Sequence, residues 1–330
     1  RFQLSQNKID IVVGTHSLFQ EKTTFNNLGL IVIDEQHKFG VQQRINLSLK
    51  GSVNTDVLLM TATPIPRTLI LTNYGDMDIS TINEKPFNNT TINTLAKPAE
   101  KMDDVMVFLK KRLNENDQVY WVTPLIEESE KLKLTPAVKR YEYLKKKLKV
   151  EVGLVHGAMK SEDKNKIMED FISGKIKVIV STTVIEVGID NQNANTMIIE
   201  NCERFGLSQL HQLRGRVGRG KEDAHCLLLY SKNIGINGKK RIQILKSSLD
   251  GFYISEEDLK LRGFGDIIGY KQSGEKDFII ADPAYHSDLF QLAKEEIENL
   301  ENKDVKLEEH FSQLLKIFKK DRVLNIIDTG

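Results

Sequence analysis

Short runs of Val, Ile and Leu recur along the chain and alternate with stretches of amphipathic, helical pattern. The runs are Ile9–Val13, Leu28–Ile33, Val57–Met60, Val119–Val122, Val152–Val155, Val178–Val180, Met197–Ile199 and Cys226–Leu229. Polar residues rarely interrupt them, which is typical of strands buried on both faces of a sheet. The helical stretches include Met102–Leu113, Tyr141–Leu148 and Asp163–Phe171. This alternation predicts an α/β fold of parallel sheets with helices on both faces.

Two changes in the pattern divide the chain into three regions. The segment Asn83–Thr90 is polar, contains a proline and has no periodicity, so we interpret it as a linker between two α/β lobes. After Tyr230, glycines interrupt a lysine-rich segment, and strands give way to helical patterns. The predicted domains are therefore 1–84, 85–232 and a mainly helical 233–330.

Composition excludes several classes of protein. Lys and Arg number 47 and Asp and Glu 46, a net charge of +1 that excludes a uniformly basic nucleic-acid binder but not a local basic groove. The two cysteines, Cys202 and Cys226, form no CxxC pair, which favours a reducing, cytoplasmic compartment over a disulfide or zinc framework. No apolar run approaches the roughly 18 residues that cross a bilayer, so no membrane association is expected.

Two adjacent carboxylates follow the apolar run Leu30–Ile33. A parallel strand delivers its carboxyl end to the ligand crevice of an open α/β sheet. There Asp34 could hold Mg²⁺ through its water shell, and Glu35 could orient and deprotonate an attacking water. A solvated Asp-Glu pair at the start of a helix explains the dipeptide equally well.

Two hydroxyls follow the run Val57–Met60. Thr61 and Thr63 could link a phosphate sensor to a second ligand, and the prolines after them fix the path of the chain. The alternative is an ordinary strand-to-helix turn with a proline near the first helical position.

Three arginines, Arg214, Arg216 and Arg219, are separated by two glycines. Guanidinium groups on such a turn can reach phosphoryl oxygens in bidentate fashion, and one could stabilise charge on a transferring γ-phosphate. A basic surface turn is the alternative, but the spacing from Gln212 through the glycines favours a functional reading.

No segment qualifies as a phosphate-binding loop. Gly215–Lys221 has the required spacing, but Glu222 stands where Ser or Thr must bind Mg²⁺. Gly263–Gly269 resembles a dinucleotide loop but has one residue too many and follows no strand. Because the chain begins at Arg1 without a methionine, we expect a piece of a longer protein whose phosphate loop lies upstream.

Together, the motifs resemble those of superfamily 2 helicases, in which two RecA-like domains hold ATP in their cleft. The matching segments are Gly14–His16, Asp34–His37, Thr61–Thr63, Val155–Gly157, Thr182–Asp190 and Gln212–Arg219. Within the superfamily the chain resembles the RecG family of branched-DNA translocases. That similarity lies in Asp34–Val41, Thr61–Thr68, Pro124–Glu130, Glu200–Leu207 and Asp258–Gly274. It implies two RecA-like parallel-sheet lobes, the first incomplete, followed by a mainly helical translocation region.

The resemblance implies roles for particular residues. Asp34 would hold Mg²⁺, Glu35 would activate water, and Arg216 and Arg219 would reach the γ-phosphate of ATP. Two further nucleotide contacts are expected at Gln212 and Asp190. The positions expected to couple hydrolysis to movement are His37, Thr61, Thr63, Arg262 and Gln272. The positions expected to contact the DNA backbone are Gly14, Thr15, His156, Gly157 and Thr182.

The resemblance also implies an activity. RecG relatives use ATP and Mg²⁺ to move along branched double-stranded DNA, reversing stalled forks and driving Holliday-junction branch migration in recombination and repair. We expect this chain to be a monomer, with single-stranded DNA-binding protein as a candidate partner, and to be inactive as an ATPase without a phosphate loop. The alternatives are a transcription-repair coupling translocase and a non-catalytic DNA-binding module. The intact pair Asp34 and Glu35, with Arg219, disfavours the module.

Overall fold

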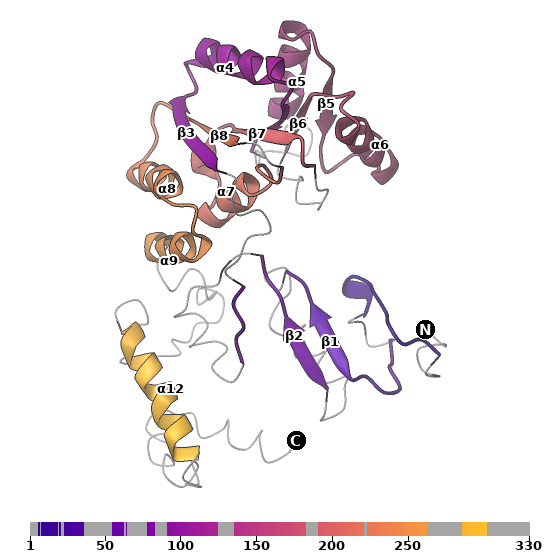
Figure 1. Ribbon diagram of the computed structural model, residues 1–330, viewed down its shortest axis with the longest axis vertical. Helices are drawn as coiled ribbons and strands as arrows, with labels where there is room; N and C mark the ends of the chain where they lie inside the picture. Colours follow the sequence, from indigo (N-terminus) through magenta and orange to yellow (C-terminus); the bar gives the residue numbers. More distant parts are fainter. Residues whose placement is uncertain are drawn as a thin grey trace. The chain divides into compact units, whose positions relative to one another are not determined.

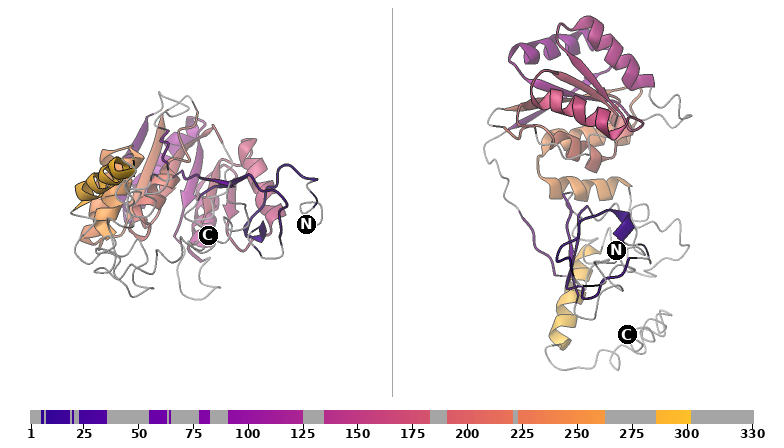
Figure 2. Two further views of the ribbon diagram at one scale, coloured as in Figure 1. Left: turned by 90° about the horizontal axis from the view of Figure 1, so that it is seen from below. Right: turned by 90° about the vertical axis from the view of Figure 1, so that its right-hand side faces the viewer.

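The computed structural model describes most of the chain in two compact units (Figures 1 and 2). The described residues are 6, 8–18, 20, 23–35, 55–62, 64, 78–82, 91–124, 135–182, 191–220, 223–262 and 286–301. The units are Arg1–Pro64 and Ile65–Gly330, and each is considered by itself. The domain boundaries expected from the sequence stay predictions, and the first of them lies outside the described residues.

The first unit contains a small parallel sheet. Its strands β1 (Leu30–Ile33) and β2 (Asp56–Leu59) pair in register, with Ile33 opposite Leu59. A short 3-10 helix, η1 (His16–Leu18), precedes them. Ile31 and Ile33 are buried against residues that include Val57 and Leu59, so the described core of this unit lies on one face of the sheet.

Two expectations are wrong for this unit. The run Ile9–Val13 forms no strand, because no described strand lies beside it to share backbone hydrogen bonds, and Val13 is 93% exposed. The sheet is also not buried on both faces, since Val32 and Leu58 are about half exposed. Burial alternates along both strands, as a one-sided core requires.

The second unit is built on a six-stranded, wholly parallel sheet of order β3-β8-β7-β4-β6-β5. The strands are β3 (Ile92–Pro98), β4 (Gln118–Val122), β5 (Val152–Val155), β6 (Val178–Ser181), β7 (Ala194–Ile199) and β8 (Ala224–Tyr230). Every run predicted here became a strand. The sequence did not indicate β3, because polar residues interrupt the apolar ones in this edge strand and leave no continuous apolar run.

Helices cover both faces of the large sheet (Figure 2). On one face α4 (Met102–Asn114) and α5 (Thr135–Lys147) pack over Val119 and Trp121 of β4. On the other, α6 (Ser161–Ile172), α7 (Leu207–Arg214) and α8 (Ile236–Ser247) enclose Tyr120 and Val122. The residues of β4 alternate between the two cores because successive side chains of a strand point to opposite faces of the sheet. The predicted α/β layers with helices on both faces are confirmed.

Three elements complete the described chain. The 3-10 helix η3 (Cys202–Arg204) joins β7 to α7, and α9 (Gly251–Arg262) packs against α7 and α8. The amphipathic α12 (Ser287–Glu301) follows further along the chain. Within the described part of the chain, every helix is too short or too polar to cross a membrane.

Candidate functional site

The carboxyl ends of β1 and β2 bring two of the predicted motifs together. Asp34 and Glu35 directly follow β1, and Thr61 follows Met60, whose backbone N–H donates to the carbonyl of Ile33 at 2.8 Å. Asp34 is exposed, whereas Glu35 is half-buried and adopts a left-handed backbone, φ 52°. Asp34 is therefore open to solvent, and the backbone leaves the strand direction at Glu35.

The carboxylates at this strand end have the oxygen ligands that Mg²⁺ prefers. Among the described residues, no group of three or more His, Cys, Asp or Glu side chains could hold a metal ion. Mg²⁺ is usually held by one or two carboxylates, by water and by substrate phosphates. Asp34 is the residue that would hold such an ion, which would neutralise phosphate charge when bound with ATP.

The end of α7 presents the predicted phosphate-binding residues. Gln212 and Arg216 are half-buried, and the Nε of Arg219 donates to the Gly215 carbonyl at 3.3 Å. Between the two arginines, Gly218 has φ 77°, a left-handed conformation that side chains other than glycine adopt at a cost. The turn therefore depends on glycine, as the sequence indicated.

Arg214 has a different role from its two neighbours. It is 1% exposed, and its guanidinium donates to the carbonyl of Leu245 on α8 and contacts His211 at 3.1 Å. Burial lowers its pKa from the usual arginine range. Arg214 lies four residues after the buried Leu210 and seven after Leu207, a helical spacing that predicts an inward position. Arg214 therefore braces α7 against α8.

A second polar group gathers at the carboxyl ends of three adjacent strands, β4, β6 and β5. The registers place Ser181 opposite Val122 and Val155, so Thr123, Thr182 and His156 follow at one level. Thr182 is fully buried, and the structure gives no hydrogen-bond partner to its Oγ1 or to His156 Nδ1. Burial, and then the charge of Lys164, lower the pKa of His156, so its ring is neutral at pH 7.

Sequence reasoning missed Ser181, which belongs to the same group. Its side chain is fully buried, and its Oγ has no partner. A buried hydroxyl without a partner costs about 1–3 kcal/mol, and a ligand that accepts or donates a hydrogen bond there would remove this cost. The signal was available, because Ser181 is the polar residue that ends the apolar run of β6.

Arg262, the last residue of α9, connects that helix to α7. Its Nη2 and Nε contact the two carboxylate oxygens of Asp258 at 3.0 and 3.1 Å, and Ser208 on α7 donates to the same carboxylate at 2.9 Å. A side chain at Gly206, just before α7, would collide with the Arg262 guanidinium. Two helices are thus fixed to each other through one buried carboxylate.

The remaining predicted positions lie in the first unit, beside His156 or outside the described residues. Gly14 and Thr15 are exposed just before η1, in the first unit. Gly157 is exposed beside His156, and its carbonyl accepts from Lys164 at 3.0 Å. The positions outside the described residues are His37, Thr63, Asp190 and Gln272.

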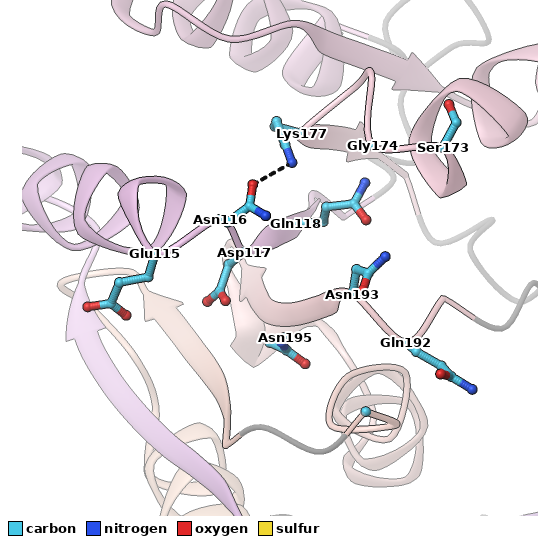
Figure 3. Close-up of a pocket in the computed structure, with 11 residues that line it drawn as sticks. Glu115, Asn116, Asp117, Gln118, Ser173, Gly174, Lys177, Gln192, Asn193 and Asn195 are labelled. Atoms are coloured by element: carbon cyan, nitrogen blue, oxygen red, sulfur yellow. Dashed lines mark hydrogen bonds between the residues drawn. The ribbon is translucent and has the colours of Figure 1, made fainter.

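A polar cavity of about 440 Å³ opens at the opposite, amino ends of β4, β6 and β7 (Figure 3). Several of its polar groups bond within the protein: Lys177 donates to Asn116 at 2.8 Å, and Asp117 accepts from Thr196 at 3.0 Å. The amide of Gln118 binds the Ile176 carbonyl at 3.0 Å. Because these partners are internal, we assign the cavity a structural role at the base of the sheet.

Comparison with protein families identifies the class. Residues 1–71 match the DEAD/DEAH box helicase family, and residues 100–221 match the helicase conserved C-terminal domain. The fold is also that of Saccharomyces cerevisiae Dbp5 bound to RNA and ADP BeF3, with a TM-score of 0.51 at 15% identity over 75% of this chain and 66% of that one. The chain therefore has the parallel-sheet core of the RecA-like helicases.

The family follows from closer relatives. Residues 248–326 match the C-terminal part of domain 3 of ATP-dependent DNA helicase RecG. The RecG of Thermotoga maritima is 44% identical over 93% of this chain and 39% of its own length, and that of Escherichia coli K12 is 47% identical over 84% and 41%. A structure of RecG bound to a three-way DNA junction matches 88% of this chain and 37% of its own, with a TM-score of 0.62 at 41% identity. The chain belongs to the RecG family and spans about two fifths of the length of these relatives.

Proposed function

We propose that the chain provides motor elements of an ATP-dependent translocase that moves along branched double-stranded DNA. Its products would be reversed forks and migrated Holliday junctions, in recombination and repair. The protein would act in the cytoplasm as a monomer, with ATP and Mg²⁺ as cofactors and single-stranded DNA-binding protein as a candidate partner. RecG relatives named as ATP-dependent DNA helicases support this assignment.

The observation that carries the proposal is the carboxylate of Asp258, shared between Arg262 and Ser208. It joins α7, which ends at the predicted nucleotide-binding arginines, to α9, which ends at a predicted coupling residue. Within α9 the Arg262 guanidinium holds the Asp258 carboxylate in place, and the link to α7 is the Ser208 hydroxyl, which donates to this carboxylate at 2.9 Å in a hydrogen bond strengthened by the charge of the acceptor. Movement of the arginine turn on ATP release would therefore be transmitted to α9 and not absorbed between the helices.

The proposed residue roles divide hydrolysis from movement. Glu35 would hold the attacking water, Asp34 would hold Mg²⁺, and Arg216, Arg219, Gln212 and Asp190 would bind the nucleotide. Thr61, Thr63, His37, Arg262 and Gln272 would couple the two events. His156, Gly157, Thr182, Gly14 and Thr15 would contact DNA phosphates, which position the duplex without reading its sequence.

The test compares the chain alone with the chain joined to the preceding segment of a RecG relative. We expect three-way-junction DNA to stimulate ATP hydrolysis only in the joined protein, and Glu35→Gln to abolish hydrolysis while DNA binding persists. Arg262→Ala should retain hydrolysis but lose translocation, measured by displacement of a third strand from a triplex. Absence of hydrolysis in both proteins would favour a non-catalytic DNA-binding module, and hydrolysis by the chain alone would reveal a phosphate site in these 330 residues.

A further inference from the structure

One face of α8 is cationic and exposed. Lys239, Lys240 and Lys246 are exposed there, together with Gln243 and Ser247. At 3.6 residues per turn these five positions fall within an arc of about 120°. We call these residues the α8 lysine face.

Packing forces these side chains outward. On the other side of α8, Ile242, Ile244 and Leu245 are buried in the core that α7 also enters. The remaining cation, Arg241, points inward and donates to the backbone carbonyls of Glu203 and Phe205, each at 3.4 Å. The arginine therefore braces the fold, while the lysines have no structural role within the described part of the chain.

The charges on this face are not neutralised locally. α8 contains no Asp or Glu, and none of its three lysines forms an ion pair with a described residue. Some lysines elsewhere do: Lys97 pairs with Asp104, Lys175 with Asp170 and Lys260 with Glu257. An unpaired surface cation can bind an external anion without first breaking an internal contact.

We propose that the α8 lysine face binds the phosphate backbone of duplex DNA. The inference rests on the proposed function and assigns part of the DNA contact to a surface outside the helicase motifs. Lys239 and Lys246 are seven residues apart, about 10 Å along the helix, close to the roughly 12 Å width of the major groove. Gln243 and Ser247 lie between and beside them and supply neutral donors of the kind that contact phosphates.

The location suits a translocase. α8 packs directly against α9, which ends at Arg262, and also contacts α7 and η3. A phosphate contact on α8 would therefore lie on the same helical layer that receives movement from the arginine turn. Such a contact would be independent of base sequence, as movement along arbitrary DNA requires.

The experiment measures binding of the full chain to a fluorescein-labelled duplex and to a three-way junction between about 50 and 200 mM salt. The variant carries Lys239→Gln, Lys240→Gln and Lys246→Gln. The matched control carries Lys145→Gln, Lys146→Gln and Lys147→Gln, three exposed lysines on α5, which covers the opposite face of the sheet. Both variants lose the same charge, so bulk electrostatics affect them equally.

Binding of DNA weakens as salt rises, and each lost phosphate contact should make the slope of log K against log salt shallower by about 0.9. If the contact contributes nothing at 1 M salt, its loss should weaken binding about eightfold at 0.1 M salt. We expect this for the α8 variant on both DNAs, with the α5 control near the unmodified chain. Equal slopes for the α8 variant and the unmodified chain would overturn the inference and leave the proposed function intact. Failure of the unmodified chain to bind either DNA would overturn both.

An acidic peptide, such as a short polyglutamate, separates DNA from a protein partner. If the α8 variant lost affinity for the peptide but kept its affinity for both DNAs, the face would be a protein-docking surface and the inference would be wrong. Similar losses for the α8 and α5 variants on DNA would likewise overturn it, since they would reflect only net charge.

Discussion

The substitution Arg214→Lys tests whether this arginine braces the fold or binds phosphate. Lysine keeps the positive charge but cannot span the acceptors that the guanidinium now contacts, Leu245 O, Thr94 Oγ1 and His211 Nδ1. An ammonium group could keep one of them. A hydrogen bond to a charged group contributes about 1.5–3 kcal/mol, and the contact with Thr94, at 3.5 Å, is at the weak limit. We therefore expect the free energy of unfolding to fall by about 3 kcal/mol.

Urea unfolding can measure this loss through the only tryptophan, Trp121, which is fully buried in the same unit. The control is Arg219→Lys at a half-buried arginine five positions later, whose Nε donates to a single backbone carbonyl and which should change the free energy of unfolding by no more than about 0.5 kcal/mol. A loss below about 1 kcal/mol for Arg214→Lys, or equal losses for both variants, would refute the bracing role.

Three further predictions concern the second unit. In Gly220→Ala the new Cβ would lie 2.5 Å from the backbone oxygen of Gln192, so urea unfolding should show a free energy of unfolding lower by about 1–3 kcal/mol. In the control, Gly235→Ala, the Cβ meets nothing within 4 Å, so the loss of stability should be far smaller. Equal losses would contradict the close-approach argument. Ser181→Ala removes a buried hydroxyl without a partner, so the free energy of unfolding should stay the same or rise. Affinity for duplex DNA should fall, and unchanged affinity would exclude Ser181 from the DNA site. Burial lowers the pKa of both His156 and His225 below the value of about 6.5 that a histidine has in the unfolded chain. As the pH falls past that value, the unfolded chain binds more protons than the folded one. The free energy of unfolding should therefore decrease as pH falls from 7.5 towards 5. Replacing both histidines with asparagine should flatten that pH dependence in urea unfolding, and an undiminished slope would assign it to other groups.

Much of the fold could be predicted because burial on two faces leaves a strong local signal. The runs that became β4 to β8 are continuous and apolar, and the helices between them show clear periodicity. The prediction failed where burial was one-sided or absent. β3 lies at the edge of the sheet and mixes polar with apolar residues, and Ile9–Val13 is apolar but has no described strand beside it.

The candidate site shows a similar division. The position of Asp34 after β1 and of Thr61 after β2 follows from the sequence, because strand ends can be located from the apolar runs. The difference between Arg214 and Arg219 could also have been inferred, since helical spacing alone places Arg214 on the buried side of α7. Because both arginines lie in one basic motif, the motif suggested the same role for both.

Local hydrophobic patterns set where each strand and helix begins and stops, so they also establish which residue types stand at its ends. The packing of the folded chain settles which of these ends become neighbours. The order β4-β6-β5 places Thr123, Thr182 and His156 side by side, although each is separated from the next by more than a full strand–helix unit of chain. Likewise, the packing of α9 on α7 brings Arg262 and Asp258 to Ser208. Such contacts depend on how whole helices and sheets pack, and no local pattern encodes that.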